Sequence, residues 1–480
     1  MRILQLASEA VPFAKTGGLA DVVGALCTYL GEAGHRIELV LPYYRGVGLK
    51  HPAGDADLVL EFRASELGTM GTGRLVSGPI AEGLRVWFVD IPELFDRDGL
   101  YGSAGSDYPD NLLRFVAYVR AALLASDRLD FKPDIVHCHD WQAALAPGWL
   151  PAGTASVMTI HNLAYQGWFP AAQRQLFESP HPRGFELPDA GDLNLLAAGL
   201  QAADQVTTVS PSYAGEITTP ELGFGLDRIL SSLEHPVEGI LNGIDTTVWN
   251  PSADPWLPVS YGPENLEDKA ASRAVLAEAF RIDAPPEVPV FGLVSRLVDQ
   301  KGIGLFADLQ EQITAWTDAR FVFLGTGDPQ HEIVLQALGE LPNVGVRIEF
   351  SERLAHLVEA GADFFLMPSA FEPCGLNQMI SQRYGTLPIV HRVGGLADSV
   401  THADGAAINA GTASGIVFEH HDDAGLEWAI GRAMDLFSDG PTYRRVQQLG
   451  MRIDHSWARR GREYEHLYER VLTRLRQTTS

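Results

Sequence analysis

Short apolar runs alternate with stretches of helical spacing along almost the whole chain. Strands of this kind, separated by helices, assemble into parallel sheets with helices on both faces. The pattern therefore predicts an α/β protein built on doubly wound parallel sheets. After a first run at 1–9, the strand candidates lie at 36–42, 84–91, 134–140, 155–162, 203–210 and 238–244, and then at 288–295, 319–327, 344–350, 362–369 and 385–391.

The chain is too long for one ordinary core, because 480 residues correspond to two domains of about 200 to 240 residues each. Turn-forming residues interrupt the pattern at 242–251, "NGIDTTVWNP". The sequence therefore predicts two Rossmann-like domains, 1–241 and 242–455. Residues 456–480 have the spacing of one long helix with no strand after it, and we expect it to cross back to the first domain.

Composition excludes several classes of partner and site. The net charge of −25 argues against nucleic acid or an anionic membrane as a partner. The three cysteines, Cys27, Cys138 and Cys374, form no C-x-x-C, so neither a disulfide framework nor a zinc site is indicated. No run approaches 18 apolar residues, and the apolar run at the N-terminus is too short for a secretory signal. We expect a cytoplasmic protein.

The loop after the first predicted strand, "PFAKTGGLADVVGAL" at 12–26, differs from the dinucleotide pattern G-x-G-x-x-G. Gly17 and Gly18 allow close approach of the backbone to a ligand, and the following helix N-terminus favours phosphate or sugar oxygens. Lys15 adds a cation and Asp21 an acceptor for sugar hydroxyls. The alternative is a plain strand-to-helix turn with a solvated lysine.

Histidines and a carboxylate end the strand predicted at 134–140, where His137, His139 and Asp140 precede Trp141. Alternation along a strand places both rings on one side, which could suit a metal, but packed neutral histidines are commoner. Trp141 beside Asp140 is typical of a sugar-contact pair, in which the aromatic face stacks on the pyranose and the carboxylate accepts its hydroxyls. Here the sequence favours a sugar over a metal.

Polar groups also close the strand predicted at 155–162. His161 and Asn162 begin the segment "HNLAYQG". They are candidates for ligand contact, and the alternative is a hydrogen-bonded cap of the loop.

Two cations follow the first predicted strand of the second half. Arg296 and Lys301 share one strand-to-helix loop and can converge on a diphosphate, unless they are merely solvated surface charges. No D-x-D motif stands at a strand end, since those at 55–57 and 96–98 lie in polar turns. A diphosphate held by arginine, lysine and helix amides needs no Mg²⁺. The sequence predicts no metal and no cofactor.

The segment "FEPCGLNQM" is the strongest local signal of the second half. Glu372 ends a strand loop, and a helix opens directly after it, so that a carboxylate and an anion-binding helix N-terminus lie side by side. Pro373 fixes the turn, Cys374 follows it, and Gly375, Leu376 and Asn377 open the helix whose amides can bind phosphate.

Taken together, these motifs resemble the bacterial glycogen synthase and plant starch synthase family, which are retaining glucosyltransferases of the GT-B type. The resemblance covers nearly the whole chain in the family's order: "KTGGLADV", "HDW", "HNLAYQG", "VSPSYAGEI", "LNGID", "SRL", "QKG", "EPCGLNQ" and "GGLADSV". It implies two domains facing across a cleft. It also implies transfer of glucose from ADP-glucose to the non-reducing 4-OH end of glycogen or another α-1,4-glucan, with retention and without a cofactor.

Two other functions compete with this one, besides UDP-glucose as the donor. A Rossmann oxidoreductase needs G-x-G-x-x-G after a strand, with an acidic residue about 20 positions later, and neither half supplies it. A non-catalytic glucan-binding protein would keep the aromatic residues and could lose Glu372 or Lys301, yet both are present.

The resemblance also implies roles for single residues. Arg296 and Lys301 would hold the diphosphate, Glu372 would bind the glucose hydroxyls, and Phe350 would stack on the base, where the family often has tyrosine. The loop 395–398 would correspond to the family's loop on the phosphate side of the donor. In the first half, the residues implied to contact glucose or the acceptor, or to close over them, are His161, Asn162, Asn242, Lys15, Gly18, Asp21, Asp140 and Trp141.

Three positions depart from the family's or the wider GT-B pattern. Gln142 replaces the second histidine of "HDWH", and "AAG" at 197–199 replaces "KAG". Either could alter acceptor binding. The second glutamate of the broader GT-B pattern is absent at Ile380, as in this family generally.

Overall fold

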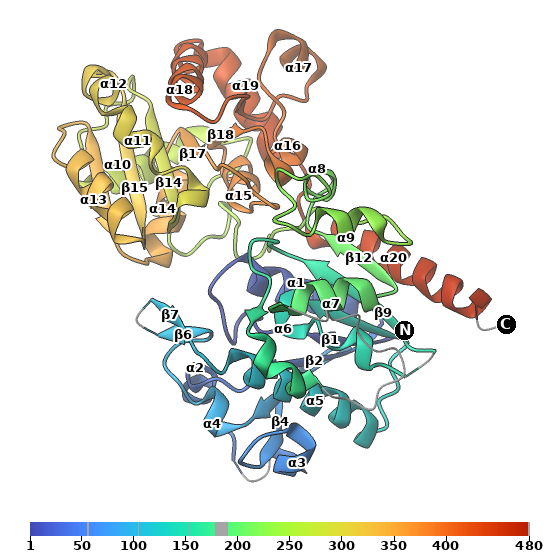
Figure 1. The fold of residues 1–480 in the computed structure, drawn as a ribbon. Coiled ribbons are helices and arrows are strands. Elements are labelled where there is room, and N and C mark those ends of the chain that lie inside the picture. Colours follow the sequence, from blue (N-terminus) through green and yellow to red (C-terminus); the bar gives the residue numbers. More distant parts are fainter. Residues whose placement is uncertain (55–56, 104, 152, 178–190, 479–480) are drawn as a thin grey trace. The chain divides into compact units, whose positions relative to one another are not determined.

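The computed structural model describes residues 1–54, 57–103, 105–151, 153–177 and 191–478 (Figure 1). Asp55 of the first D-x-D lies outside these residues. The chain divides into two compact units. Unit 1 comprises Met1–Gly243 together with Trp457–Ser480, and unit 2 comprises Ile244–Ser456. In the described part of the chain, no helix is both long enough and apolar enough to cross a membrane.

Unit 1 is built on a nine-stranded sheet of order β13-β12-β9-β8-β1-β2-β5-β4-β3. From β13 to β5 all pairs are parallel; in the register beside β1, Ile3 lies opposite Ile37 and Ile135. These strands follow the predicted apolar runs. Their bounds are Arg2–Leu6 (β1), Arg36–Pro42 (β2), Leu84–Asp90 (β5), Ile135–His139 (β8), Ala155–Ile160 (β9), Gln205–Thr208 (β12) and Glu238–Gly239 (β13).

One edge of this sheet was not anticipated. The strands β3 (Leu58–Phe62) and β4 (Gly73–Ala81) pair antiparallel with each other, and β4 pairs antiparallel with β5. Both strands are exposed over much of their length, and Glu61 in β3 and Gly78 and Pro79 in β4 interrupt their apolar residues, so neither has the continuous buried run by which the other strands are recognised. Among the described residues, two further two-stranded antiparallel sheets lie in this unit, β6 (Gly102–Ser103) with β7 (Ser106–Asp107) and β10 (Trp168–Phe169) with β11 (Leu193–Asn194).

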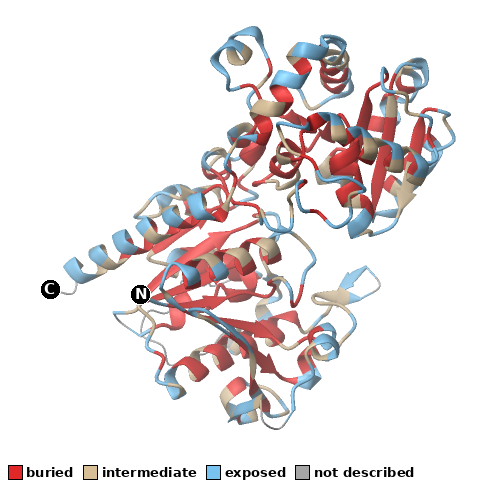
Figure 2. Cartoon of the chain, turned by 180° about the vertical axis from the view of Figure 1, so that it is seen from behind, coloured by how far each residue is buried: buried red, intermediate tan, exposed pale blue. Residues whose placement is uncertain are grey.

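The helices of unit 1 cover the sheet and expose their outer faces, while the central parallel strands are largely buried (Figure 2). Tyr118 of α5 ties that helix to two neighbouring strand ends, because its hydroxyl lies 2.9 Å from the carbonyl of Ala7 and 2.8 Å from that of Val40. The helices are α1 (Gly18–Glu32), α2 (Arg45–Lys50), α3 (Ala64–Leu67), α4 (Pro92–Phe95), α5 (Asn111–Arg128), α6 (Asp140–Ala143), α7 (Leu195–Ala202), α8 (Pro211–Glu216), α9 (Asp227–Ser232) and α20 (Trp457–Thr478).

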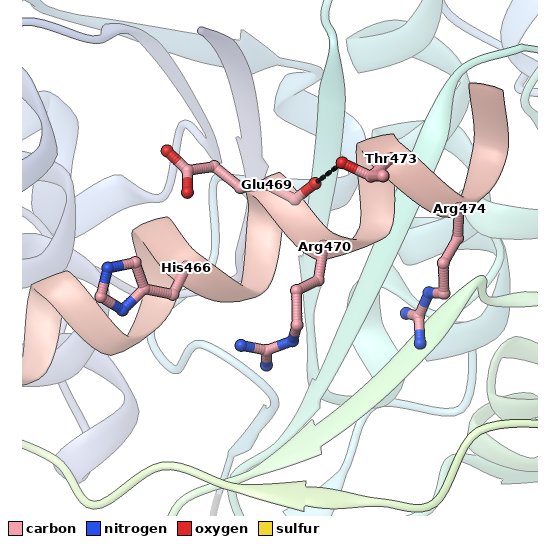
Figure 3. Close-up of a pocket in the computed structure, with 5 residues that line it drawn as sticks. All are labelled: His466, Glu469, Arg470, Thr473 and Arg474. Atoms are coloured by element: carbon pink, nitrogen blue, oxygen red, sulfur yellow. Dashed lines mark hydrogen bonds between the residues drawn. The ribbon is translucent and has the colours of Figure 1, made fainter. Parts of the chain in front are cut away.

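The last helix, α20, packs on unit 1 beside α1. Tyr29 of α1 donates a hydrogen bond to Glu465 at 2.8 Å. On its outer side α20 carries a shallow groove of about 510 Å³ (Figure 3), where Arg470 binds Glu238 and Arg474 binds Gln205. These contacts fasten the helix to β12 and β13, so the two arginines are anchors. The groove is lined by His466, Glu469, Arg470, Thr473 and Arg474.

Unit 2 has a six-stranded, wholly parallel sheet of order β16-β15-β14-β17-β18-β19. Its core contains a stack of phenylalanine rings from three adjacent strands, with Phe291 5.2 Å from both Phe321 and Phe364. The strands are β14 (Val290–Leu297), β15 (Arg320–Gly327), β16 (Val344–Ile348), β17 (Phe364–Met367), β18 (Leu387–His391) and β19 (Ile416–Phe418).

The helices of unit 2 connect these strands. They are α10 (Lys269–Phe280), α11 (Leu305–Asp308), α12 (Gln310–Ala315), α13 (Pro329–Leu338), α14 (Glu352–Gly361), α15 (Asn377–Arg383), α16 (Gly394–Ser399), α17 (Gly405–Ala410), α18 (Asp423–Ser438) and α19 (Gly440–Met451). Numbered along the chain, the strands of this sheet have the Rossmann order 3-2-1-4-5-6, and the parallel part of the first sheet runs in the same order. The predicted α/β class with two Rossmann-like sheets is confirmed.

Candidate active site

The strand order of each sheet marks where a ligand binds. In unit 1 the strand order reverses between β1 and β8, and in unit 2 it reverses between β14 and β17. Ligands of open α/β sheets bind outside the carboxyl ends of the strands at such a switch point. The site residues predicted from the sequence lie at the carboxyl end of a strand or in the segment that follows it, up to the first turn of the next helix.

The loop after β1 presents a cation and a carboxylate together. Lys15 donates a hydrogen bond to Asp21 at 2.7 Å, and both side chains are partly exposed. Helix α1 begins at Gly18, and no side chain caps its N-terminus at Gly17. A Cβ at Gly17 would have no atom within 4 Å, so the backbone here faces open space. The loop can approach an oxygen-rich ligand closely.

A buried glutamate, which the sequence analysis did not single out, holds this loop in place. Glu9 accepts hydrogen bonds from the backbone and hydroxyl of Thr16 and from the hydroxyl of Tyr101. Ser8 also bonds the Tyr101 hydroxyl at 2.7 Å. Burial raises the pKa of Tyr101 well above its usual value, so it remains a hydrogen-bond donor. A charged residue directly after an apolar strand was the available signal.

The two histidines of β8 are packed side by side in the sheet. The ring centroids of His137 and His139 lie 4.1 Å apart. His137 bonds Tyr468 at 2.8 Å and Thr159 at 2.6 Å, and His139 bonds two further side chains. Burial lowers the pKa of His137 to about 3, so the ring is neutral. The described residues contain no group of three or more metal-ligating side chains. These histidines serve as hydrogen-bonded core residues.

Asp140 turns its carboxylate onto the loop after β9. It accepts a hydrogen bond from the backbone N–H of His161 at 2.7 Å, and the N–H of Asn162 also stabilises its charge. Burial nevertheless raises the pKa of Asp140 to about 7. Its φ of 55° is unusual for a residue other than glycine, and such strain is common at functional sites. Asp140 therefore connects the segment at the end of β8 to the segment after β9, and both were predicted as parts of the site.

Trp141 and Asn162 have internal partners. The Trp141 ring packs edge-on against Phe115, with centroids 4.9 Å apart, and a Cβ at Gly167 would lie 2.6 Å from it. Asn162 accepts a hydrogen bond from the backbone of Ala164 at 3.0 Å. The structure thus gives both residues a clear packing or capping function, and their contact with a sugar stays a prediction.

His161 and Asn242 each have one polar atom that a ligand could bind, Nδ1 of His161 and Oδ1 of Asn242. His161 bonds His139 through Nε2 at 2.9 Å, and burial lowers the pKa of His161 to about 3. Asn242 is buried at the end of unit 1, and within the described residues its Oδ1 accepts no hydrogen bond. A buried amide oxygen without a partner is costly, so a ligand hydroxyl would be a favourable partner for it.

In unit 2 the structure brings Lys301 and Glu372 together. Nζ of Lys301 donates to Oε2 of Glu372 at 2.6 Å, and Ser369 donates to the same oxygen at 2.9 Å. The loop after β14 packs so closely against the residue after β17 that a Cβ at Gly302 would lie 1.9 Å from the carbonyl of Pro368. Only glycine fits there, with its φ of 69°. The sequence predicted both side chains but not their contact.

Arg296 is an exposed cation on the strand that leads to Lys301. It lies near the end of β14, and among the residues that the structure describes its guanidinium makes no hydrogen bond or ion pair. An arginine that is not used internally at a switch point is well suited to bind phosphate oxygens in bidentate fashion.

The segment after Glu372 is held against β14 and α16. Asn377 donates its side-chain amide to the carbonyl of Val294 at 2.9 Å, and a Cβ at Gly395 would lie 2.2 Å from the carbonyl of Cys374. Gly375 has a φ of 69°, and Leu376 precedes α15 without a side-chain cap. The first amides of α15 are therefore not bonded by a capping side chain.

Phe350 follows β16 by two residues and is 85% exposed. An aromatic ring so exposed buries little apolar surface within the fold, so it is available to a ligand.

Comparison with known proteins agrees with this geometry. Residues 2–232 match the family model "Starch synthase catalytic domain", and residues 277–448 match "Glycosyl transferases group 1". The chain is 44% identical to glycogen synthase 1 of Methylococcus capsulatus, covering 98% of this chain and 97% of that protein. The glycogen synthase of Myxococcus xanthus is also 44% identical, with 98% and 99% covered. The chain belongs to the glycogen synthase and starch synthase family.

Solved structures extend this result. The catalytic domain of Arabidopsis thaliana starch synthase IV, bound to ADP and acarbose, superposes with a TM-score of 0.84 at 32% identity, covering 98% of this chain and 99% of that one. Sucrose-phosphate synthase of Thermosynechococcus elongatus shares the fold, with a TM-score of 0.62 at 16% identity. The predicted resemblance to the glycogen synthase family and the prediction of a hexosyltransferase are confirmed.

Proposed function

We propose that this glycogen synthase family member transfers the glucosyl group of ADP-glucose to the non-reducing 4-OH end of glycogen or another α-1,4-glucan, with retention of configuration. The observation that carries the proposal is the Lys301–Glu372 pair, together with the exposed Arg296, at the switch point of the second sheet. The related starch synthase IV, whose structure contains ADP and acarbose, supports an adenine nucleotide donor and a glucan acceptor.

The second unit has the groups that such a donor needs. An ammonium has three N–H donors, and Lys301 uses one of them on Glu372, which leaves two for phosphate oxygens. Arg296 adds its fork of donors. Oε2 of Glu372 accepts hydrogen bonds from Lys301 and Ser369, so Oε1 remains to accept hydrogen bonds from glucose hydroxyls. Phe350 stacks on adenine, and the segment 374–377 offers amides to the phosphates.

The chemistry follows from where charge develops. When the bond from the anomeric carbon to the diphosphate oxygen breaks, the bonding pair goes to the diphosphate and the sugar gains oxocarbenium character. Arg296 and Lys301 neutralise the leaving diphosphate, and the acceptor hydroxyl attacks from the same face. The cations of this site provide the neutralisation, so we propose a mechanism without a metal or a cofactor.

The first unit supplies the acceptor side. In this proposal His161 and Asn242 contact the transferring glucose, and Asp140, Trp141 and Asn162 line the acceptor segment. Lys15, Gly18 and Asp21, held by Glu9, close over donor and acceptor. We also infer a cytoplasmic location, because the three cysteines are buried and free and so suit a reducing compartment.

The experiment is incorporation of labelled glucose into glycogen, with ADP-glucose and UDP-glucose assayed in parallel. Transfer from ADP-glucose supports the proposal, and faster transfer from UDP-glucose would replace the donor. If the protein binds glycogen but incorporates glucose from neither nucleotide, it is a non-catalytic glucan-binding protein, and the proposal of an enzyme is refuted.

A further inference from the structure

Buried side chains connect the C-terminal helix α20 to His161. The amide nitrogen of Gln5 in β1 donates to the hydroxyl of Tyr468 at 3.4 Å. Oε1 of the same Gln5 lies 2.8 Å from Nε2 of His139 in β8. Nδ1 of His139 lies 2.9 Å from Nε2 of His161. All four residues are buried, so water does not compete for these bonds.

The bonds determine where the hydrogens lie. The amide oxygen of Gln5 can only accept, so Nε2 of His139 carries a hydrogen. A neutral imidazole has one N–H, and burial lowers the pKa of His139 well below its usual value, so this ring is neutral. Its Nδ1 therefore accepts a hydrogen bond, and Nε2 of His161 donates it. His161, also neutral, is left with a lone pair and no hydrogen on Nδ1.

We propose that Gln5 and His139 are positioning residues, which hold His161 in the Nε2–H tautomer so that its Nδ1 accepts a hydrogen bond from a hydroxyl of the donor sugar. Among the described residues Nδ1 of His161 has no hydrogen-bond partner, although the ring is only 8% exposed. The inference rests on the proposed function for one step only, the contact of His161 with the sugar.

Helix α20 takes part through the orientation of Gln5. An amide turned by 180° would offer N–H to His139, and every hydrogen in the chain would then move to the opposite nitrogen. In the present orientation the Tyr468 hydroxyl accepts from the Gln5 amide, which leaves the hydrogen of that hydroxyl available to Nδ1 of His137, 2.8 Å away. The helix that ends the chain thus influences which nitrogen of His161 faces a ligand.

Nitrogen NMR tests the tautomer without any need for activity. The protein is labelled with ¹⁵N and ¹³C in histidine only, and long-range ¹H–¹⁵N correlations show which ring nitrogen bears hydrogen. The signals are assigned from the spectra of His139→Asn and His161→Asn. We expect the Nε2–H form for both rings. An Nδ1–H form of His161 would overturn the proposal.

Kinetics test the consequence for the sugar. His139→Leu removes the acceptor, whereas His139→Asn keeps an amide oxygen near the position of Nδ1. Because one hydrogen bond that orients a ring contributes about 1 kcal/mol, we expect kcat with ADP-glucose to fall about fivefold in His139→Leu and to recover largely in His139→Asn. His137→Leu, from the same strand and equally buried, removes a partner of the Tyr468 hydroxyl but none of the bonds between Gln5, His139 and His161, so kcat should fall less than in His139→Leu.

The outcomes separate the two proposals. Equal kcat in wild type and His139→Leu, with folding verified by circular dichroism, overturns the positioning role. If His139→Leu does not fold, Gln5→Met removes the acceptor for His139 at similar volume and must change the His139 tautomer signals. A wild type that folds but transfers no glucose refutes the proposed function, and the NMR result still decides the tautomer.

Discussion

Replacing Lys301 by methionine tests the ion pair at the centre of the proposed site. Nζ of Lys301 and Oε2 of Glu372 are 2.6 Å apart, and the two side chains are 19% and 8% exposed. Removing one partner of a fully buried pair costs about 3–5 kcal/mol, whereas an exposed pair contributes about 0–1 kcal/mol. Lys301 is partly exposed and Ser369 still donates to Glu372, so we expect Lys301→Met to lower the free energy of unfolding by about 2 kcal/mol.

The two functions of Lys301 predict different behaviour in a double variant. Glu372→Gln removes the uncompensated charge, so Lys301→Met with Glu372→Gln should regain most of the lost stability. Turnover should not recover. Loss of a cation that stabilises a leaving group costs about a hundred- to a thousandfold in rate, and the second substitution restores no charge.

Calorimetry and incorporation of labelled glucose measure the two quantities. For a unit of this size, the loss in Lys301→Met corresponds to about 4–8 °C in the unfolding temperature. A double variant as unstable as Lys301→Met would show that the pair does not stabilise the fold. Turnover of Lys301→Met near that of wild type would refute its role at the diphosphate.

Three further predictions follow from the same structure. Arg296→Ala should lower turnover about a hundred- to a thousandfold, less than additively with Lys301→Ala since both act on one charge, and activity should survive EDTA; abolition by the chelator would contradict the metal-free mechanism. Phe350→Ala should weaken ADP-glucose binding by about 1–2 kcal/mol with little change in kcat, and an unchanged KM would place the ring elsewhere. The pKa of His137 is about 3 when folded, against 6.5 in the unfolded chain, so its contribution to stability is present above pH 6.5 and is lost as pH falls toward 3. His137→Gln should therefore flatten the acid side of the stability curve by about 1.4 kcal/mol per pH unit, and an unchanged slope in urea titrations would rule this out.

The strands and loops of this protein were predictable because their signals are local. A buried parallel strand needs an apolar run, and the predicted run at 362–369 contains β17, Phe364–Met367. The strand-to-helix loops were equally visible, since the glycines and charges of the segment from Lys15 to Asp21 stand together in the sequence. The edge strands β3 and β4 were not predicted because an exposed strand needs no continuous apolar run: Glu61 interrupts the apolar residues of β3, and Gly78 and Pro79 interrupt those of β4.

Contacts between distant residues depended on the tertiary structure. Lys301 and Glu372 are 71 positions apart, and they meet because β14 and β17 are neighbours in the sheet. Gln5 and His139 are 134 positions apart and meet through the pairing of β1 with β8. Local periodicity determines that a segment is a strand but does not encode which strand lies beside it. By itself, the sequence determined the elements and the chemistry-bearing residues at their ends. The order of the strands decided which residues became partners, because a hydrogen bond or an ion pair requires its two atoms to be within about 3 Å.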